Sequence, residues 1–163
     1  MNLNKAKNIQ TALFVVALIA LIVGLVFSVK ADKARAHNVE DIVIEITGDY
    51  TETEGNYCYV YTHFKITNNT RKTLNYVEVK THFTDKNGRS LGTMTTTLGS
   101  IYGNGLSLEK GESVVKTTYL EDPYYSMSDL FEGLYENGVS AYNVEHEITY
   151  AYWSDGYTWP DND

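Results

Sequence analysis

An uninterrupted apolar stretch near the N-terminus limits the fold of this 163-residue chain more than any other feature. No charged residue occurs between Asn8 and Val29, and almost every residue from Thr11 onward in this stretch is apolar. About 20 helical residues, each rising about 1.5 Å, cross the roughly 30 Å hydrocarbon core of a bilayer. A helix that is apolar on every face would otherwise need a large protein core around it, and the remaining chain is too short to supply one. We therefore predict one N-terminal transmembrane helix over residues 10–29.

The same stretch can also be interpreted as a signal peptide whose cleavage would give a secreted protein. Cleaved signals have an apolar region of about 7–15 residues, followed by small residues at the cleavage site. Small residues do follow at positions 31, 34 and 36, but Lys30, Lys33 and Arg35 lie among them and disfavour cleavage. The length of the stretch and its basic flank therefore favour a retained signal anchor.

The predicted anchor makes the chain a single-pass protein of the cell membrane. Basic residues flank the helix on both sides, two before it and three after it, so the positive-inside rule does not decide the orientation. A folded domain that follows a first apolar segment is usually translocated. We expect a short cytoplasmic N-terminus at residues 1–9, a tether at residues 30–39 and an extracytoplasmic domain after it.

The part of the chain that follows the tether is strongly acidic. Residues 38–163 contain 8 basic and 20 acidic side chains, a net charge of −12, whereas the whole chain has −8. Such a surface repels phosphate backbones, which argues against nucleic acid as a partner. The single cysteine, Cys58, excludes an intramolecular disulfide and any multi-cysteine metal site. The sequence predicts no cofactor.

Residues 40–154 are predicted to form a β-rich domain, because apolar and polar residues alternate with a period of two. In the segment 57–67, alternate residues from Cys58 to Ile66 form an apolar face, and segment 74–84 repeats this pattern. The polar turn 68–72 joins these two segments, which are expected to pair as an antiparallel hairpin. The predicted strands cover residues 41–47, 57–67, 74–84, 90–98, 113–120 and 141–153.

One short helix is predicted before the last strand. Ser126 and Asp129 resemble a capping box, an apolar stripe recurs at helical spacing from Met127, and Asn137-Gly138 supplies a stop. Residues 155–163 form an acidic C-terminal tail. Six strands without repeated β-α units predict an all-β fold, an immunoglobulin-like antiparallel β-sandwich preceded by the transmembrane helix. A partly open barrel is the alternative.

Residues 64–120 resemble the FxLYD domain, an extracytoplasmic bacterial module. The matching segments are an Asn-rich turn, a hydrophobic strand that ends in Asp, a Gly turn and a Leu-x-x-Gly-Glu turn. Of the motif that names the family, only Asp85 is retained. The resemblance implies a β-sandwich on an envelope protein and carries over no catalytic residues. The segments are Thr67-Asn68-Asn69-Thr70, Val77–Asp85, Asn87-Gly88 and Leu108–Glu112.

Several polar motifs have structural explanations that we favour over chemical ones. His63 and His82 project outward from their strands and are two ligands where a metal site needs three or four. Residues 85–88 begin like a calcium loop but are explained by a hairpin turn. Cys58 is expected to be a buried apolar thiol, and Asn68-Asn69-Thr70 matches a glycosylation acceptor. No nucleophile, phosphate loop or metalloprotease motif is present in the sequence, so we predict that the protein is not an enzyme.

Tyrosine, with fourteen occurrences, is the most unusual component. Tyr57, Tyr59 and Tyr61 share the outward face of one predicted strand, and Tyr76 has the same parity on the next. Exposed aromatic side chains of this kind anchor protein interfaces and stack on sugars. Alternatively, this face is a second buried face of the sandwich, stabilised by cross-strand aromatic pairs.

The predicted function is non-catalytic binding of an envelope protein or a cell-wall glycan by a membrane-anchored extracytoplasmic domain. The four tyrosines are the candidate contact residues. The alternative is a structural or assembly subunit of a membrane complex that acts through its transmembrane helix at residues 10–29. The sequence fixes no oligomeric state.

Overall fold

The structure, a computed structural model, describes residues 3–99, 105–123 and 128–160. The chain divides into two compact units, Met1–Ala36 and His37–Asp163. Ser126 of the predicted capping box and Met127 of the predicted apolar stripe lie outside the described residues, as does the end of the acidic tail.

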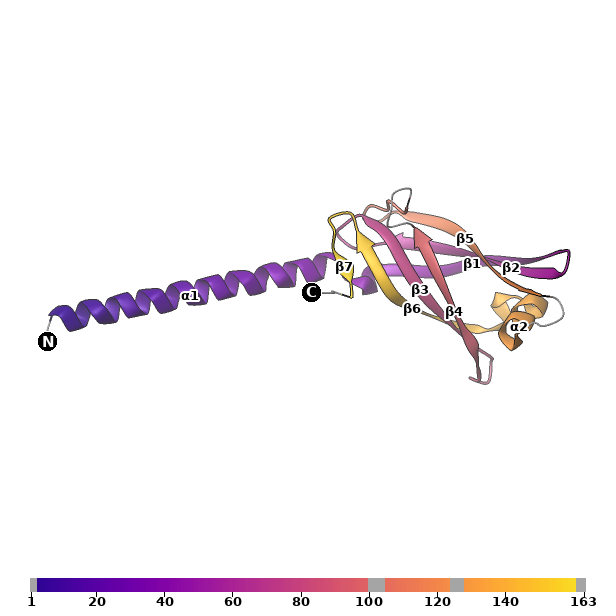
Figure 1. Cartoon of the computed structure of the whole chain (residues 1–163), viewed down its shortest axis with the longest axis horizontal. Helices are drawn as coiled ribbons and strands as arrows, with labels where there is room; N and C mark the ends of the chain where they lie inside the picture. Colours follow the sequence, from indigo (N-terminus) through magenta and orange to yellow (C-terminus); the bar gives the residue numbers. More distant parts are fainter. Residues whose placement is uncertain (1–2, 100–104, 124–127, 161–163) are drawn as a thin grey trace. The chain divides into compact units, whose positions relative to one another are not determined.

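The first unit is a single helix, α1 (Leu3–Ala36), which continues through much of the segment predicted as a tether (Figure 1). From Val15 to Val29 its large apolar side chains are 46–69% exposed. Among the helical residues whose side chains the structure describes, no span combines the length and the apolar character needed to cross a bilayer. The membrane anchor therefore stays a prediction from the sequence.

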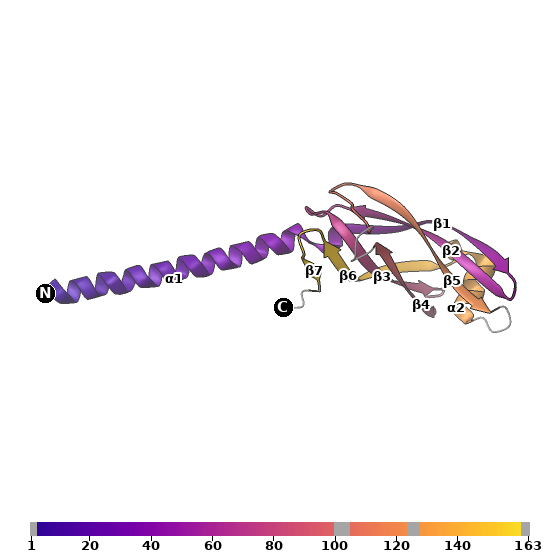
Figure 2. The same ribbon diagram turned by 45° about the horizontal axis from the view of Figure 1, so that its top comes forward.

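The second unit is an antiparallel β-sandwich, which confirms the all-β prediction (Figures 1 and 2). One sheet has the strand order β1-β2-β5 and the other β4-β3-β6-β7, and all pairs are antiparallel. The bounds of the strands are β1 Ile42–Glu54, β2 Tyr57–Asn68, β3 Leu74–Thr84, β4 Ser90–Gly99, β5 Ser113–Pro123, β6 Asn143–Trp153 and β7 Thr158–Trp159.

The predicted hairpin between residues 57–67 and 74–84 is wrong. These segments are β2 and β3, which lie in different sheets, and β2 pairs with β1 and β5 instead. The turn between them is too long for a tight two-residue hairpin, and it carries the chain from one sheet to the other. The inward parity of both strands is nevertheless confirmed, because Cys58, Phe64 and Phe83 are fully buried between the sheets.

The predicted short helix is present as α2 (Asp129–Asn137). Its N-cap is Ser128, whose hydroxyl accepts a hydrogen bond from the Phe131 amide at 3.3 Å. Gly138 ends the helix with a φ of 72°, a value that glycine adopts without strain. Phe131 and Leu134 are buried, and α2 packs against β2, β4 and β5 at one end of the sandwich.

A buried polar network stands where the chain passes between the sheets. The Asn68 side-chain amide donates to the carbonyl oxygens of Lys72 at 2.8 Å and Leu108 at 2.7 Å. Its Oδ1 accepts from the backbone amide and the hydroxyl of Thr70. The Trp153 indole N–H donates in turn to Thr70 Oγ1 at 3.1 Å. Because Asn68 is fully buried with every polar group paired, it is not accessible as a glycosylation acceptor in the folded protein.

A second contact holds the two ends of the domain together. The buried His37 places Nε2 3.0 Å from Asp155 Oδ2, and its ring stacks on Tyr157 at a centroid distance of 4.3 Å. Lys72 Nζ lies 3.3 Å from the same carboxylate oxygen. Residues 155–160 of the predicted acidic tail therefore fold onto the domain, where β7 pairs with β6.

We expect Asn68→Ala to lower the free energy of unfolding by about 2–4 kcal/mol, because it leaves buried carbonyl and hydroxyl groups without partners. Asn69→Ala is the matched control, since Asn69 is adjacent and exposed, and its cost should stay within about 0.5 kcal/mol. Urea unfolding of both variants measures the difference. Equal losses in the two variants would contradict the role assigned to Asn68.

The Asp155 carboxylate predicts an acid-sensitive contribution to stability. Burial alone would raise its pKa, but hydrogen bonds from His37 and Lys72 outweigh burial and lower the pKa below the usual value of 3.8. A lowered folded-state pKa means that the stabilisation is complete above the unfolded-state pKa and is lost as the pH falls through the folded-state value. The free energy of unfolding of the wild type should therefore exceed that of Asp155→Asn by about 0.5–1 kcal/mol near pH 5, and this difference should disappear near pH 2.5. Unfolding curves across this range test the expectation, and a gap that widens toward acid would contradict it.

Candidate functional site

Five tyrosines gather on the outer face of the β1-β2-β5 sheet, and we call this surface the tyrosine face. Their positions follow from strand register, since Tyr61 on β2 lies directly opposite both Tyr50 on β1 and Tyr119 on β5. Tyr59 and Tyr57 occupy the next outward positions along β2. The tyrosine face consists of Tyr50, Tyr57, Tyr59, Tyr61 and Tyr119.

The rings of the central members contact one another. Tyr50 and Tyr61 are stacked with a centroid distance of 4.6 Å and an interplanar angle of 7°. Tyr119 lies 5.6 Å from Tyr61 and 5.8 Å from Tyr59, and Tyr59 lies 6.1 Å from Tyr61. Aromatic pairs at these separations contribute about 0.5–1.5 kcal/mol each beyond their burial, so the rings hold one another in place.

The tyrosine face is open to solvent. Tyr119 is 55% exposed, Tyr57 46% and Tyr50 43%, while Tyr59 and Tyr61 are partly covered by their neighbours. The inner face of the same sheet carries the core, so the alternative that these tyrosines form a second buried face is wrong.

Carboxylates border the tyrosine face. Glu52 on β1 and Glu121 on β5 lie opposite Tyr59 on either side. Partial desolvation and then the negative charge of Glu121 raise the pKa of Tyr59, and desolvation followed by Glu52 raises the pKa of Tyr61. The phenols of Tyr59 and Tyr61 therefore remain protonated at neutral pH and can both donate and accept hydrogen bonds beside the two carboxylates.

Tyr76, the fourth predicted site residue, lies elsewhere. It belongs to β3 in the other sheet, where its ring meets Tyr150 edge to face at 5.7 Å. Burial and then Glu78 raise its pKa. The prediction grouped it with the other three because it assumed that β2 and β3 pair.

Sequence reasoning missed Tyr50 and Tyr119. In β1 the even-numbered residues Ile42 to Ile46 face inward, yet Tyr50 faces outward, because the register shifts between Ile46 and Gly48. Such a bulge inserts one residue and reverses the parity of those that follow. The alternation within β5 predicts that Tyr119 faces outward. Its position beside Tyr61, however, follows only from the pairing of β2 with β5.

The other candidate residues have structural roles. His63 and His82 lie in different sheets, with His63 Nδ1 2.8 Å from Thr117 Oγ1 and His82 Nε2 3.3 Å from Glu147 Oε2. Asp85 Oδ1 accepts the Asn87 and Arg89 amides, and these bonds lower the pKa of Asp85 despite partial desolvation. That geometry confirms a hairpin turn. Among the residues that the structure describes, no three or more His, Cys, Asp or Glu side chains converge as a metal site.

Comparisons with known proteins assign the chain to no family. No family model and no curated protein matches it. Among solved structures it is similar to the crystal structure of an ApaA protein from Bordetella pertussis, with 12% identity over 73% of this chain and 85% of that one. The TM-score is 0.39, so this likeness carries no argument about fold or function.

We expect Tyr50 and Tyr61 to be energetically coupled by about 0.5–1.5 kcal/mol, because their rings are stacked. The measurement is a double-mutant cycle with Tyr50→Ser and Tyr61→Ser, followed by urea unfolding. The matched cycle pairs Tyr50→Ser with Tyr57→Ser, whose positions lie further apart along the face and should be additive within about 0.5 kcal/mol. Equal coupling in both cycles would show that the stacked pair is not a specific unit.

Proposed function

We propose that this protein is a membrane-anchored, non-catalytic binding protein whose tyrosine face contacts another envelope protein. The observation that carries the proposal is the row Tyr50–Tyr61–Tyr119, three aromatic rings held in register by three strands, of which the two outer rings are open to solvent. Aromatic side chains that are already ordered lose little conformational entropy on binding and are typical of interface anchors.

Two features favour a protein partner with basic residues over a wall glycan. Sugars stack on the flat faces of aromatic rings, whereas Tyr61 has Tyr50 stacked against it and Tyr119 beside it. The exposed hydroxyls and ring edges are bordered by Glu52 and Glu121, which suit Lys or Arg side chains. The glycan remains the second candidate because Tyr57 and Tyr119 keep large exposed areas.

The proposed cellular location and membrane topology of the protein rest on the sequence. Residues 10–29 are the signal anchor, residues 1–9 lie in the cytoplasm, and the domain at residues 40–154 lies outside the cell membrane. The exposed apolar side chains of α1 between Val15 and Val29 support this proposal, because they need an apolar environment. They would serve equally in the alternative function, assembly of a membrane complex through the helix.

We also propose that the sandwich is immunoglobulin-like, as the number and spacing of the strands predicted from the sequence indicate. A three-stranded and a four-stranded sheet of antiparallel strands are typical of that architecture. In this assignment β1, β2 and β5 form one sheet, and β3 and β6 are the central strands of the other.

We expect a photo-crosslinking amino acid placed at Tyr119 to capture a defined envelope protein in living cells. The matched control is the same amino acid at Thr95, an exposed position on β4 of the other sheet, which should capture nothing. Glu121→Lys should reduce the crosslink at Tyr119 severalfold, because it reverses the charge beside the face. Binding of purified cell-wall glycan without a protein crosslink would favour the second candidate.

The same cells can be used to test the proposed membrane topology. Protease added outside should remove a C-terminal tag and leave a membrane-held stub. A tag that is protected until the membrane is opened would place the domain in the cytoplasm. Crosslinking that fails after α1 is replaced by an unrelated membrane helix would favour assembly through the helix.

A further inference from the structure

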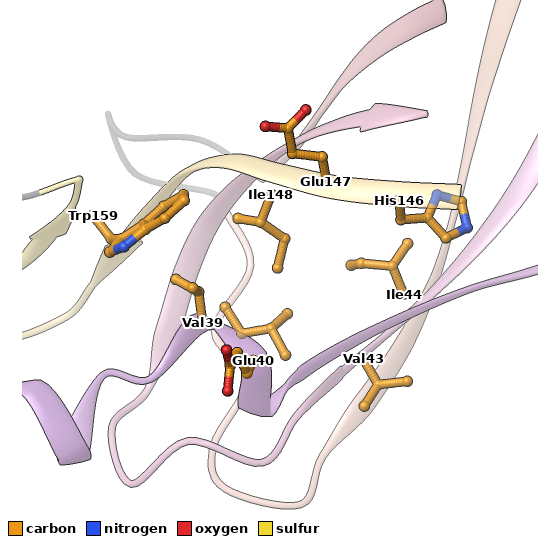
Figure 3. Close-up of a pocket in the computed structure, with 9 residues that line it drawn as sticks. Val39, Glu40, Val43, Ile44, His146, Glu147, Ile148 and Trp159 are labelled. Carbon is orange, nitrogen blue, oxygen red and sulfur yellow. The ribbon is translucent and has the colours of Figure 1, made fainter. Parts of the chain in front are cut away.

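A groove opens between the two sheets (Figure 3), and none of its lining residues belongs to the tyrosine face. It has a volume of about 550 Å³ and lies between β1 and β6. Ile44 and His146 lie between these strands in the close-up, whereas Glu147 points away from the cavity. The apolar lining consists of Val39, Ile42, Val43, Ile44, Ile148 and Trp159.

The groove exists because one strand of its sheet is short. Strand β7 pairs with β6 only through Trp159 opposite Ala151 and Thr158 opposite Tyr152. Among the described residues, no strand pairs with the same edge of β6 over residues 143–150, a length of roughly 25 Å. Strand β1 is likewise the edge of its own sheet. An unpaired backbone edge therefore runs directly beside an apolar slot.

The charged side chains of β6 at this edge are acidic. Glu145 and Glu147 alternate on the outward face of β6 and are exposed, with His82 and Lys80 opposite them on β3. Glu40 lines the groove from the other side. His146 faces the groove, and its partial burial lowers its pKa. The groove between β1 and β6 therefore combines an apolar lining, an unpaired backbone edge of β6 and carboxylates along that edge.

We propose that the β1–β6 groove captures an extended strand of a partner protein in which apolar and basic residues alternate. The added strand would pair with β6, direct its apolar residues into the slot and place its Lys or Arg residues beside Glu145 and Glu147. Period-two alternation matches β6 from Asn143 to Ile148, before the register shift between Ile148 and Tyr150, because successive side chains of a regular strand point to opposite faces.

Other occupants use only part of these features. An acyl chain fits the apolar lining but leaves the β6 edge unpaired and ignores the carboxylates. A second copy that pairs β6 with β6 brings Glu145 and Glu147 against their own counterparts, and like charges across strands destabilise pairing. Since the domain carries a net charge of −12 as well, repulsion disfavours self-association.

Three synthetic peptides of about nine residues test the proposal with the full-length protein, in one detergent throughout. The first alternates Lys and Val, the second alternates Glu and Val, and the third is the Lys–Val peptide with every backbone amide methylated, so that it can donate no hydrogen bond to β6 from either edge. Fluorescence anisotropy measures each affinity, and hydrogen exchange locates the contact. The Lys–Val peptide should bind at least about tenfold more tightly than either of the others and should protect amides of residues 143–150.

Charge-reversal variants keep the test independent of folding, because they change only exposed side chains. The double variant Glu145→Lys and Glu147→Lys should weaken the Lys–Val peptide about tenfold and strengthen the Glu–Val peptide. Glu136→Lys on α2 is the matched control and should change neither affinity. Tyr61→Ser should also leave peptide affinity unchanged, which separates this groove from the tyrosine face.

Several outcomes would overturn the proposal. Equal binding of the methylated peptide would show attraction by charge without strand pairing, and unchanged affinity in the double variant would remove the role of the carboxylates. Protection confined to strands other than β6 would place the peptide elsewhere. Binding of palmitate by the groove without any peptide binding would assign it to a lipid. A dimer in sedimentation that the double variant disperses would assign it to a second copy.

Discussion

The arrangement of the sandwich depends on how the chain is held where it crosses between the sheets after β2. Asn68 is fully buried there, and each of its side-chain polar groups is hydrogen-bonded within the protein. The Thr70 hydroxyl, which bonds to Asn68, also accepts a hydrogen bond from the indole N–H of Trp153 in β6. Burial of the Asn68 amide without these partners would destabilise the fold by more than the hydrogen bonds stabilise it. The turn therefore has one favourable conformation. That conformation places β3 in the sheet opposite β2 and gives both edges of β2 to β1 and β5. The row of tyrosines exists only because of this pairing.

The sequence predicted what depends on local alternation, and it failed where register and partners decide. Six of the strands, the short helix and the inward faces that include Phe64 and Phe83 follow from periodicity, because a half-buried strand must alternate. The second half of β1 and the two-residue β7 were not predicted. The hairpin between β2 and β3 was wrong because adjacency along the chain is only a tendency, and the deciding hydrogen bonds of Asn68 reach Leu108, which is distant in sequence.

The candidate site divides in the same way. Tyr57, Tyr59 and Tyr61 could be assigned to one face because they share a strand and its parity. Tyr76 carried the same local signal, but strand partners placed it in the other sheet. The membership of Tyr50 depends on the bulge after Ile46, where a polar Thr and a Gly give no periodic signal that separates an inserted residue from an ordinary one. Sequence parity therefore identifies the members of a face within a strand, and tertiary pairing decides which strands share it.

Because of the bulge in β1, residues of this one strand contribute both to the groove beside β6 and to the tyrosine face. Before it, Ile42 and Ile44 face inward and line the groove beside β6, whereas after it Tyr50 faces outward and stacks on Tyr61. Without the inserted residue, Tyr50 would face inward, and Tyr61 would lose its stacked neighbour. Both surfaces combine an apolar or aromatic centre with a carboxylate border, so the same long-range field would attract a basic partner to either one. Selection between them must then come from short-range geometry, because an unpaired backbone edge accepts only an extended strand, while a row of fixed rings also accepts side chains from folded surfaces.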